Sequence, residues 1–164
     1  MAKGDYTRRE YSIAEIAYLA GIIDGEGSIY IGNFSSNPKT GNKYYQTNME
    51  VTNTEKSLID WLHSTFGGHI NAYTAKQTPK NSRKAVWRWI ASGERMTHLC
   101  EMILPFLICK VPQANIMLKM RSTYTKLQHK KGSQGIQAHT PELLALRQSY
   151  MNEMRALHCR NYSN

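Results

Sequence analysis

The side chains best suited to chemistry near the start of the sequence are two carboxylates, Asp24 and Glu26, which are separated by Gly25 and followed by Gly27. They stand at the end of a segment that is typical of one short helix. Because glycines end that helix, the two acids lie at its tail. If two copies of the helix packed together, Asp24 and Glu26 of one copy would lie close to the same residues of the other copy, beside the two-fold axis. The two chains would then share one acidic centre.

The helix that positions these acids has two faces on which other chain segments can pack. Apolar residues recur at helical spacing and predict a core face, which consists of Ile13, Ile16, Ala17, Ala20 and Ile23. A second stripe contains small residues at spacings of four, three and four, on which another backbone can approach closely: Ala14, Tyr18, Gly21 and Gly25. The segment is too short and too acidic at its end to span a bilayer. We therefore expect a second, similar helix to pack against it, through Tyr18, Gly21, Ile22 and Gly25.

The run from Leu19 to Gly27, LAGIIDGEG, resembles the signature of the LAGLIDADG homing endonucleases. It differs from that signature by Ile for Leu, Gly for Ala and Glu for Asp. The alternative is a glycine-capped core helix that happens to end in acids. Family members with two motifs are pseudo-symmetric monomers, and those with one motif are homodimers. Since this sequence contains one motif, the resemblance implies the homodimeric type.

The charge of the 164-residue chain favours a polyanionic partner. It contains 21 Lys and Arg against 12 Asp and Glu, a net charge of +9. Acids are absent between Asp60 and Glu94 and again between Glu101 and Glu142, although basic residues fall in both intervals. Such blocks, in a chain that also contains ten Tyr and three Trp, indicate nucleic acid. The alternative is a basic face that only keeps the protein in solution.

The cysteines indicate a reducing compartment. Cys100, Cys109 and Cys159 are odd in number and have no paired C-x-x-C spacing, so the sequence suggests neither a disulfide framework nor a zinc site. Residues 1–10 lack the apolar run of a signal peptide and the pattern of a transit peptide. We expect an intracellular protein, in the cytoplasm or an organelle matrix, that is not secreted and has no membrane anchor.

After Gly27 the hydrophobic period changes to two, which predicts two hairpins. Their strands span about 28–34 and 44–52, then about 69–77 and 84–91. The residues expected to face inward are Ile29, Ile31, Asn33, Tyr45, Thr47, Met49, Val51, Trp87, Trp89 and Ala91, and on the third strand Ile70, Ala72 and Thr74 alternate with Asn71, Tyr73 and Ala75. A slip of one residue would instead place both tryptophans on the open face.

Helical patterns follow each hairpin. Thr54 is expected to cap a helix whose buried side contains Leu58, Leu62, Thr65 and Phe66, and a second helix contains Met96, Leu99, Cys100 and Ile103. Further helices are expected over 113–127 and 141–158. The order predicts an α+β fold with an αββαββα core, a four-stranded antiparallel sheet and helices on one face. We expect one domain over 1–164, with its core at about 11–120 and a helical extension at 121–164, which could pack behind the sheet or touch DNA.

The αββαββα plan also matches the core of the resembled family, over about 11–120. The resemblance implies that Glu26 is a metal ligand, together with the backbone carbonyl of Gly25. Carboxylate and carbonyl oxygens with several waters suit Mg²⁺, which promotes phosphodiester hydrolysis by holding the phosphate and lowering the pKa of a water. For Asp24 a cap or turn role is favoured over direct ligation.

Two further catalytic candidates follow from the same resemblance. Lys110, in a Pro-Phe-Leu-x-x-Lys segment, falls where the family keeps a basic residue near the scissile phosphate; the alternative is a solvated lysine. Asn53 falls where the family often has an amide that positions solvent, with Gln113 as a weaker candidate. Asn53 could equally cap the helix that follows it.

Outward residues of the strands are the candidates for DNA contacts. Purine edges are expected to be read by Gln46, Asn48, Asn71 and Arg88, and cytosine by Glu50. Ser28 and Tyr30 lie nearest the expected axis, and Tyr73 shares the outward side. Lysines at strand ends and turns are expected to meet phosphates: Lys39, Lys43, Lys76, Lys80 and Lys84.

The sequence thus leads to a specific hypothesis, which combines the residues with the resemblance. We expect a Mg²⁺-dependent homodimeric endonuclease that cuts double-stranded DNA at a long, near-palindromic site and promotes the mobility of its intron. As in the family, cuts across the minor groove would leave short 3′ overhangs. The alternatives are an RNA-binding intron maturase and a non-catalytic DNA-binding regulator. Retention of Glu26 with Lys110 favours the nuclease, because a carboxylate near phosphate is repulsive without metal.

Overall fold

A computed structural model of the chain describes residues 9–34, 44–73, 85–124 and 140–159. The elements, in chain order, are α1 (Ile13–Glu26), β1 (Gly27–Phe34), β2 (Tyr44–Asn53), α2 (Lys56–Phe66), β3 (His69–Tyr73), β4 (Val86–Ser92), α3 (Gly93–Ile103), the 3₁₀ turn η1 (Leu104–Phe106), α4 (Val111–Ser122) and α5 (Pro141–Cys159). This order confirms the predicted αββαββα core with further helices after it.

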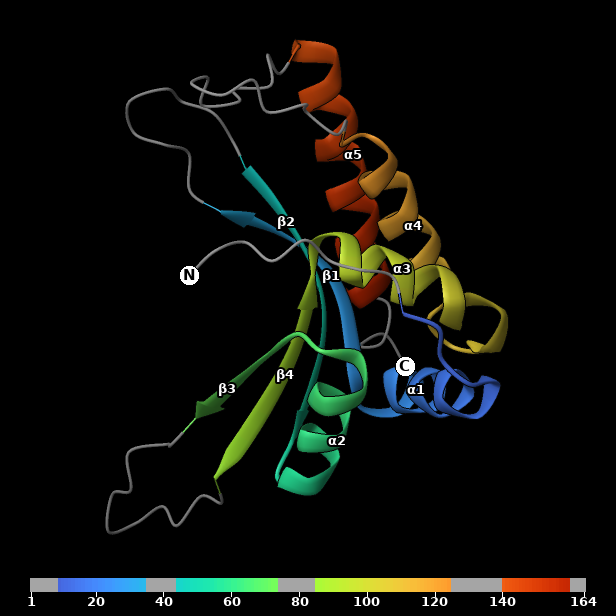
Figure 1. The fold of residues 1–164 in the computed structure, drawn as a ribbon. Coiled ribbons are helices and arrows are strands. Elements are labelled where there is room, and N and C mark those ends of the chain that lie inside the picture. The colour runs from blue at the N-terminus through green and yellow to red at the C-terminus, as the bar shows by residue number, and fades with distance from the viewer. Residues whose placement is uncertain (1–8, 35–43, 74–84, 125–139, 160–164) are drawn as a thin grey trace, which may run out of the picture.

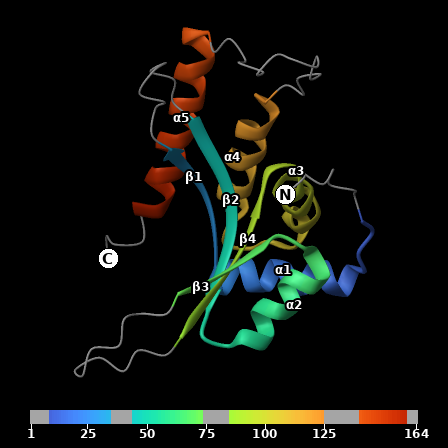
Figure 2. The same cartoon turned by 60° about the vertical axis from the view of Figure 1, so that its left-hand side comes forward.

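The strands form one four-stranded antiparallel sheet in the order β1-β2-β4-β3. Figure 1 shows the helices gathered on one side of this sheet, while the other side has no helix over it. We call the uncovered side the outward face. Figure 2 shows the same arrangement from a second direction, with α4 and α5 beside the ends of β1 and β2 that lie farthest from α1. The predicted α+β class and one-sided helical layer are therefore confirmed.

Strand alternation places the predicted residues in the core. On β1 and β2, Ile29, Met49 and Val51 are fully buried. On β4, Trp89 and Ala91 are fully buried, and Trp87 packs partly buried against the same core. The tryptophans therefore face inward, and the alternative register is excluded. On β3, one of the two edge strands, Ile70 is only half-buried and Ala72 is exposed.

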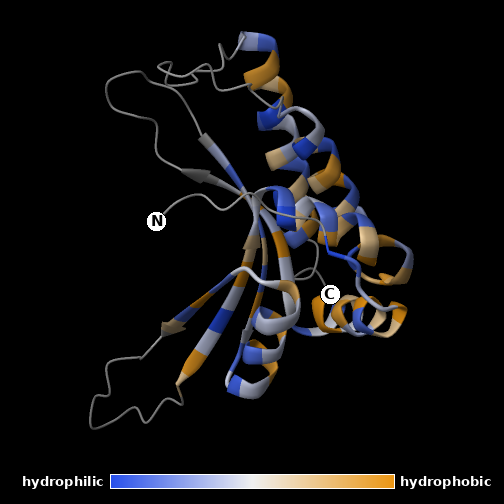
Figure 3. Cartoon of the chain, viewed as in Figure 1, coloured by the Kyte–Doolittle hydropathy of each residue, from blue (hydrophilic) through white to orange (hydrophobic). Residues whose placement is uncertain are grey.

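The core face of α1 differs from the prediction. The capping box of Ser12 and Glu15 starts the helix at Ile13, which is 76% exposed, and Ala17 is also exposed. The helix packs instead through Ile16, Leu19, Ala20, Ile22 and Ile23. Figure 3 shows hydrophobic residues along most of α1. Because the helix is apolar on nearly all sides, its periodicity could not select the side that meets the sheet.

Two helix boundaries also differ from the prediction. The N-cap of α2 is Glu55, whose carboxylate accepts a hydrogen bond from Ser57 N, and not Thr54. The helix α4 ends at Ser122 and not near 127. There Thr123 Oγ1 donates to Met120 O at 2.7 Å, and Ser122 Oγ donates to Lys119 O at 2.7 Å. Hydroxyl groups that bond to helical carbonyls compete with continued helix, which explains the early end.

The C-terminal helices pack behind the sheet, which decides between the two placements left open by the sequence. Tyr124 Oη, just beyond α4, donates to Tyr45 O of β2 at 2.9 Å, and Tyr45 Oη donates to Gln148 Oε1 of α5 at 3.0 Å. Arg147 of α5 is 2% exposed and donates to Thr123 Oγ1 and O at 2.9 and 2.8 Å. Its guanidinium also lies 4.2 Å from the centre of the Tyr124 ring. Within the described ranges, none of the helices has the length and apolar character needed to cross a membrane.

Candidate functional site

One carboxylate, that of Asp24, connects the C-terminal end of α1 to the segment that leads into α4. Asp24 accepts backbone hydrogen bonds from Ile108 N at 2.6 Å, Cys109 N at 3.2 Å and Lys110 N at 2.9 Å. Partial burial raises the pKa of Asp24, but these three bonds to the ionised form and the charge of Lys110 outweigh it, so the pKa lies below its usual range. The cap or turn role expected for Asp24 is thus the one that the contacts support.

Lys110 is held at the same end of α1. Its Nζ donates to the backbone oxygen of Asp24 at 2.6 Å, and the residue is half-buried. A cation bonded to a carbonyl in the last turn of a helix also interacts favourably with the helix dipole. The lysine is therefore not freely solvated. Gly25 and Glu26 follow directly and are exposed, so Glu26 and Lys110 belong to one acidic-basic end of α1.

The motif glycines have different reasons to be glycine. A Cβ atom on Gly27 would lie 2.7 Å from the Cα of Ile23, so the chain's own packing excludes a side chain there. A Cβ atom on Gly21 or Gly25 would meet no atom within 4 Å. These two glycines therefore lie on an open stripe of α1.

The predicted helix-contact residues separate into two groups. Tyr18, Gly21 and Gly25 are exposed, with Tyr18 stacked edge-on against Trp61 of α2 at a ring-centroid distance of 5.0 Å. Ile22 is 8% exposed and belongs to the core of its own chain. Tyr18, Gly21 and Gly25 are therefore accessible to a second helix, whereas Ile22 packs α1 against the core of its own chain.

Large exposed hydrophobic residues gather next to this stripe. Ile13 and Tyr18 lie on α1, and Phe106 and Ile108 lie on or next to η1, in the segment that Asp24 binds. Of the large hydrophobic residues that are exposed in the described ranges, only Leu146 of α5 lies elsewhere. Exposed apolar side chains grouped on one surface indicate an interaction site.

The amide candidates have structural contacts of their own. Asn53 Oδ1 accepts a hydrogen bond from Glu55 N at 2.8 Å, so its side chain shapes the turn that leads into α2, whose N-cap is Glu55 and not Asn53. Gln113, in the first turn of α4, has a buried Oε1 for which the described residues provide no hydrogen-bond partner.

The outward face of the sheet brings together most of the predicted DNA contacts that the structure describes. Cross-strand pairing aligns Ser28 with Glu50, Tyr30 with Asn48, and Arg88 with Asn71. Gln46 lies nearer the start of β2 and is half-buried. For Tyr73 the structure gives only its place at the end of β3. The five lysines proposed for phosphate contacts, Lys39, Lys43, Lys76, Lys80 and Lys84, lie outside the described residues.

A hydrogen-bonded network on the outward face was not foreseen. Asn48 Nδ2 donates to Tyr30 Oη at 3.0 Å, and Tyr30 Oη donates to Glu50 Oε1 at 2.5 Å. Glu50 Oε2 lies 3.8 Å from Arg88 Nη1. Asn48 is only 3% exposed, which corrects its prediction as a residue that reads bases. Strand parity puts these residues on one face, but only the cross-strand register shows that they meet.

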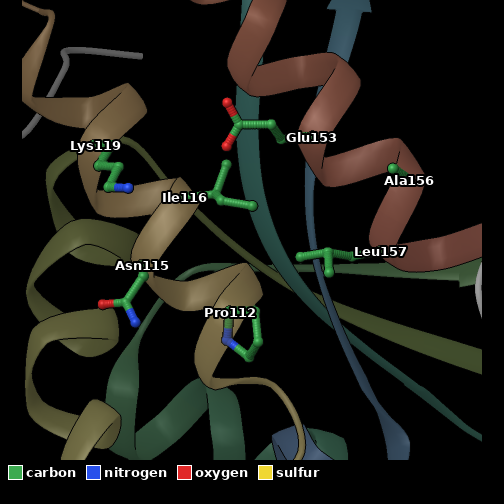
Figure 4. Close-up of a pocket in the computed structure, with 7 residues that line it drawn as sticks. All are labelled: Pro112, Asn115, Ile116, Lys119, Glu153, Ala156 and Leu157. Atoms are coloured by element: carbon green, nitrogen blue, oxygen red, sulfur yellow. The ribbon is translucent and has the colours of Figure 1, made fainter.

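The end of α1 that contains Gly25 and Glu26 is exposed at the surface. A cavity of about 360 Å³ lies between α4 and α5, and its lining includes Lys119 and Ile116 of α4 and Glu153 and Leu157 of α5 (Figure 4). Neither acid of the α1 tail lines it, and Lys110 does not line it either. In the parts of the chain that the structure describes, no three His, Cys, Asp or Glu side chains form a metal cluster. The metal-ligand role expected for Glu26 and the Gly25 carbonyl therefore stays a prediction.

Comparison with known proteins finds similarity in structure alone. No protein-family model matches the sequence, and no curated protein matches it. The chain is similar to homing endonuclease I-CvuI in complex with its target in the presence of Ca²⁺, with a TM-score of 0.68 and 16% identity over 88% of this chain and 82% of that chain.

Two other solved structures show the same likeness. I-SmaMI, a LAGLIDADG homing endonuclease bound to cleaved DNA, matches with a TM-score of 0.62 and 16% identity over 93% of this chain and 47% of that chain. The archaeal intron-encoded homing endonuclease I-Vdi141I, complexed with DNA, matches with a TM-score of 0.57 and 12% identity over 88% and 92%. Together with the motif Leu19–Gly27, this likeness shows that the chain has the fold of the LAGLIDADG homing endonucleases.

Proposed function

We propose that this protein is a site-specific, Mg²⁺-dependent DNA endonuclease that acts as a homodimer on a near-palindromic site and promotes the mobility of its intron. The observation that carries the proposal is the contact set of Asp24. Its carboxylate binds the backbone of residues 108–110, and its carbonyl accepts a bond from Lys110 Nζ. A fixed cation and the exposed carboxylate of Glu26 thereby share one end of α1. The likeness to homing endonucleases solved with DNA supports the same assignment.

The oxygen donors at this end fit magnesium. Glu26 and the carbonyl of Gly25 are hard ligands on an exposed helix end, and they leave room for the waters that Mg²⁺ retains. When bound, the ion would polarise the scissile phosphate and lower the pKa of a water. One chain contributes a single Glu26, so two copies are needed to surround the scissile phosphates.

Lys110 is the group that would stabilise charge on the phosphate. Its ammonium is positioned before substrate arrives, because Asp24 holds both its backbone and its Nζ. Preorganised charge acts strongly where negative charge develops in the transition state. The lowered pKa of Asp24 keeps this support ionised at neutral pH. Asn53 uses its Oδ1 in the turn into α2, so any solvent that it positions would be bound through Nδ2.

The homodimer is supported by the open side of α1. Gly21 and Gly25 leave space on that side, and Ile13 and Tyr18 are exposed beside it. We place the protein inside the cell, with the DNA that it cuts.

The test is a cleavage assay with purified protein on a plasmid library that carries random inserts, in Mg²⁺ and in Ca²⁺. The expected result is Mg²⁺-dependent double-strand cutting at one near-palindromic site. Strong, salt-sensitive DNA binding without cuts would overturn the nuclease assignment in favour of a regulator. Tight binding to structured RNA that is indifferent to metal would overturn it in favour of a maturase.

A further inference from the structure

We propose that Glu50 is a positioning residue for base recognition. It holds the guanidinium of Arg88 toward one guanine in each half-site and does not itself contact a base. The inference rests on the proposed function, since it takes duplex DNA as the ligand of the outward face. It replaces the expectation that Glu50 accepts a hydrogen bond from cytosine.

Both carboxylate oxygens of Glu50 are directed at protein groups. Oε1 accepts the hydroxyl hydrogen of Tyr30 at 2.5 Å, and Oε2 lies 3.8 Å from Arg88 Nη1. The Glu50 side chain is 12% exposed, against 31% for Arg88. A base amine would have to displace one of these partners to reach Glu50. The more exposed guanidinium is therefore the member of the pair that meets the groove.

Tyr30 on the neighbouring strand β1 and Asn48 on the same strand β2 support Glu50. Asn48 Nδ2 donates to Tyr30 Oη, and the Tyr30 hydroxyl has only one hydrogen, which it donates to Glu50. Burial raises the pKa of Tyr30, and the bond to Glu50 raises it further, so the hydroxyl keeps this hydrogen at neutral pH. Asn48 is almost fully covered. The Tyr30 hydroxyl therefore has no hydrogen left to donate to DNA, and together the two residues fix the carboxylate.

Arg88 occupies an open row of the outward face. It pairs across the sheet with Thr52 of β2 and Asn71 of β3, and both of these are exposed. Arginine presents five N–H donors in a planar fork, a geometry that matches O6 and N7 of guanine. A long side chain held at one nitrogen loses less conformational freedom when it binds a base.

The experiment is selection of bound duplexes from a randomised DNA library in Ca²⁺, followed by sequencing. Arg88→Ala should reduce a preference for guanine of roughly a hundredfold at one base pair of each half-site to almost none. Glu50→Gln should reduce the preference at that same base pair by about three- to tenfold, and should have no further effect in the Arg88→Ala background. Tyr30→Phe keeps the charges of Glu50 and Arg88, and it should reduce the guanine preference at the same base pair by a smaller factor. Glu153→Gln on α5 makes the same chemical change on an exposed residue and should leave the selected sequence unchanged.

Three results would overturn the inference. If Glu50→Gln alters a different base pair, or still acts when Arg88 is absent, Glu50 reads DNA directly. If Glu50→Gln and Tyr30→Phe fold, as shown by thermal melting, and leave the selected sequence intact, Glu50 does not position Arg88. If the wild-type protein enriches no duplex at all, the proposed function fails and the inference fails with it. This third result can be distinguished from the first two, because in those the wild-type protein still selects a sequence with which the variants are compared.

Discussion

The helices α1 and α2 lie on the same side of the sheet but differ in what they present to solvent. The exposed residues of α2 are polar: Lys56, Ser57, Asp60, His63 and Ser64. Those of α1 are mostly small or apolar: Ile13, Ala14, Ala17, Tyr18, Gly21 and Gly25. Each helix packs on the core through an apolar stripe, so burial alone does not explain the contrast. The solvent-facing side of α2 is polar and needs no further partner in water. The solvent-facing side of α1 has the composition of a contact surface.

This contrast separates what one chain needs to fold from what the proposed homodimer needs to act. In α1, residues such as Leu19 and Ile23 serve the chain's own core. Gly21 and Gly25 serve no contact that one chain makes, and Glu26 lies beyond them at the exposed end. Substitutions in α1 should therefore affect folding, assembly or catalysis separately, and matched substitutions in α2 should not affect assembly or catalysis.

The largest effect is expected from Glu26→Gln at the tail of α1. The amide keeps the size of the side chain but removes the charge that holds a divalent cation, so cleavage in Mg²⁺ should fall by about a thousandfold while DNA binding persists. Single-turnover cleavage and binding in Ca²⁺ measure the two separately. The control is Asp60→Asn on α2, which removes only an exposed ion pair with Lys56 and should cut normally. Full cleavage by Glu26→Gln would refute the metal assignment.

The next effect concerns assembly. Gly21→Leu should fold, because a Cβ at this position meets no atom of its own chain, but it should block a second helix and yield an inactive monomer. Light scattering gives the mass, and circular dichroism checks the fold. His63→Leu adds a comparable apolar side chain to the exposed side of α2 and should leave the dimer intact. A dimeric Gly21→Leu protein would remove the interface from the proposal.

A smaller effect distinguishes the glycines within the motif. Gly27→Ala should destabilise the chain by about 2–3 kcal/mol, because its Cβ would lie 2.7 Å from the backbone of Ile23. Gly25→Ala has open space and should change stability by less than about 1 kcal/mol. Urea unfolding in the Gly21→Leu background keeps dissociation out of the measurement. Equal losses for both substitutions would contradict the two roles.

The smallest effect is in the pH dependence of stability. The pKa of Asp24 is lower in the folded chain than in the unfolded chain, so its contribution is present above the unfolded value of about 4 and disappears as the pH falls through the folded value. Asp24→Asn should cost about 1 kcal/mol at pH 7 and flatten the acid side of the stability curve.

A matched acid on α2 sharpens this last prediction. The pKa of Glu55 is lowered by hydrogen bonds from Ser57, first from its side chain and then from its backbone N–H. Glu55→Gln should therefore also flatten the acid side, but only Asp24→Asn should slow cleavage, because only Asp24 holds Lys110. Acid denaturation curves and cleavage rates test the pair. Equal cleavage rates for the two variants would show that the tie between Asp24 and Lys110 is purely structural.

The fold was largely predictable, because strand parity and helix period follow directly from which residues are apolar. Trp89 and Met49 face inward, as their alternation predicted. The failures occurred where that signal was weak or local. On α1 nearly every position is apolar or small, so the core side was chosen wrongly at Ile13 and Ala17. At the end of α4, hydroxyl groups of Ser122 and Thr123 ended the helix although the pattern continued.

The candidate site was predictable in its parts but not in its contacts. The motif identified Asp24 and Glu26, and a separate segment identified Lys110. Asp24 and Lys110 are far apart in the sequence, so no local pattern indicates that they are in contact. The tie between Asp24 and residues 108–110 exists because the packing of α1 against η1 brings those backbone N–H groups to the helix tail. Similarly, Asn48 was predicted to be exposed, and only the register of β1 against β2 places Tyr30 over it.

The sequence by itself determined the order of elements, the side of each strand that meets the core and the acids at the tail of α1, because these depend on residue type and local period. The tertiary structure alone decided that Asp24 fixes Lys110, that Glu50 faces Tyr30 and Arg88, and that the C-terminal helices pack behind the sheet. These contacts join residues distant in sequence. Their existence depends on how whole elements pack, which no local pattern of residues encodes.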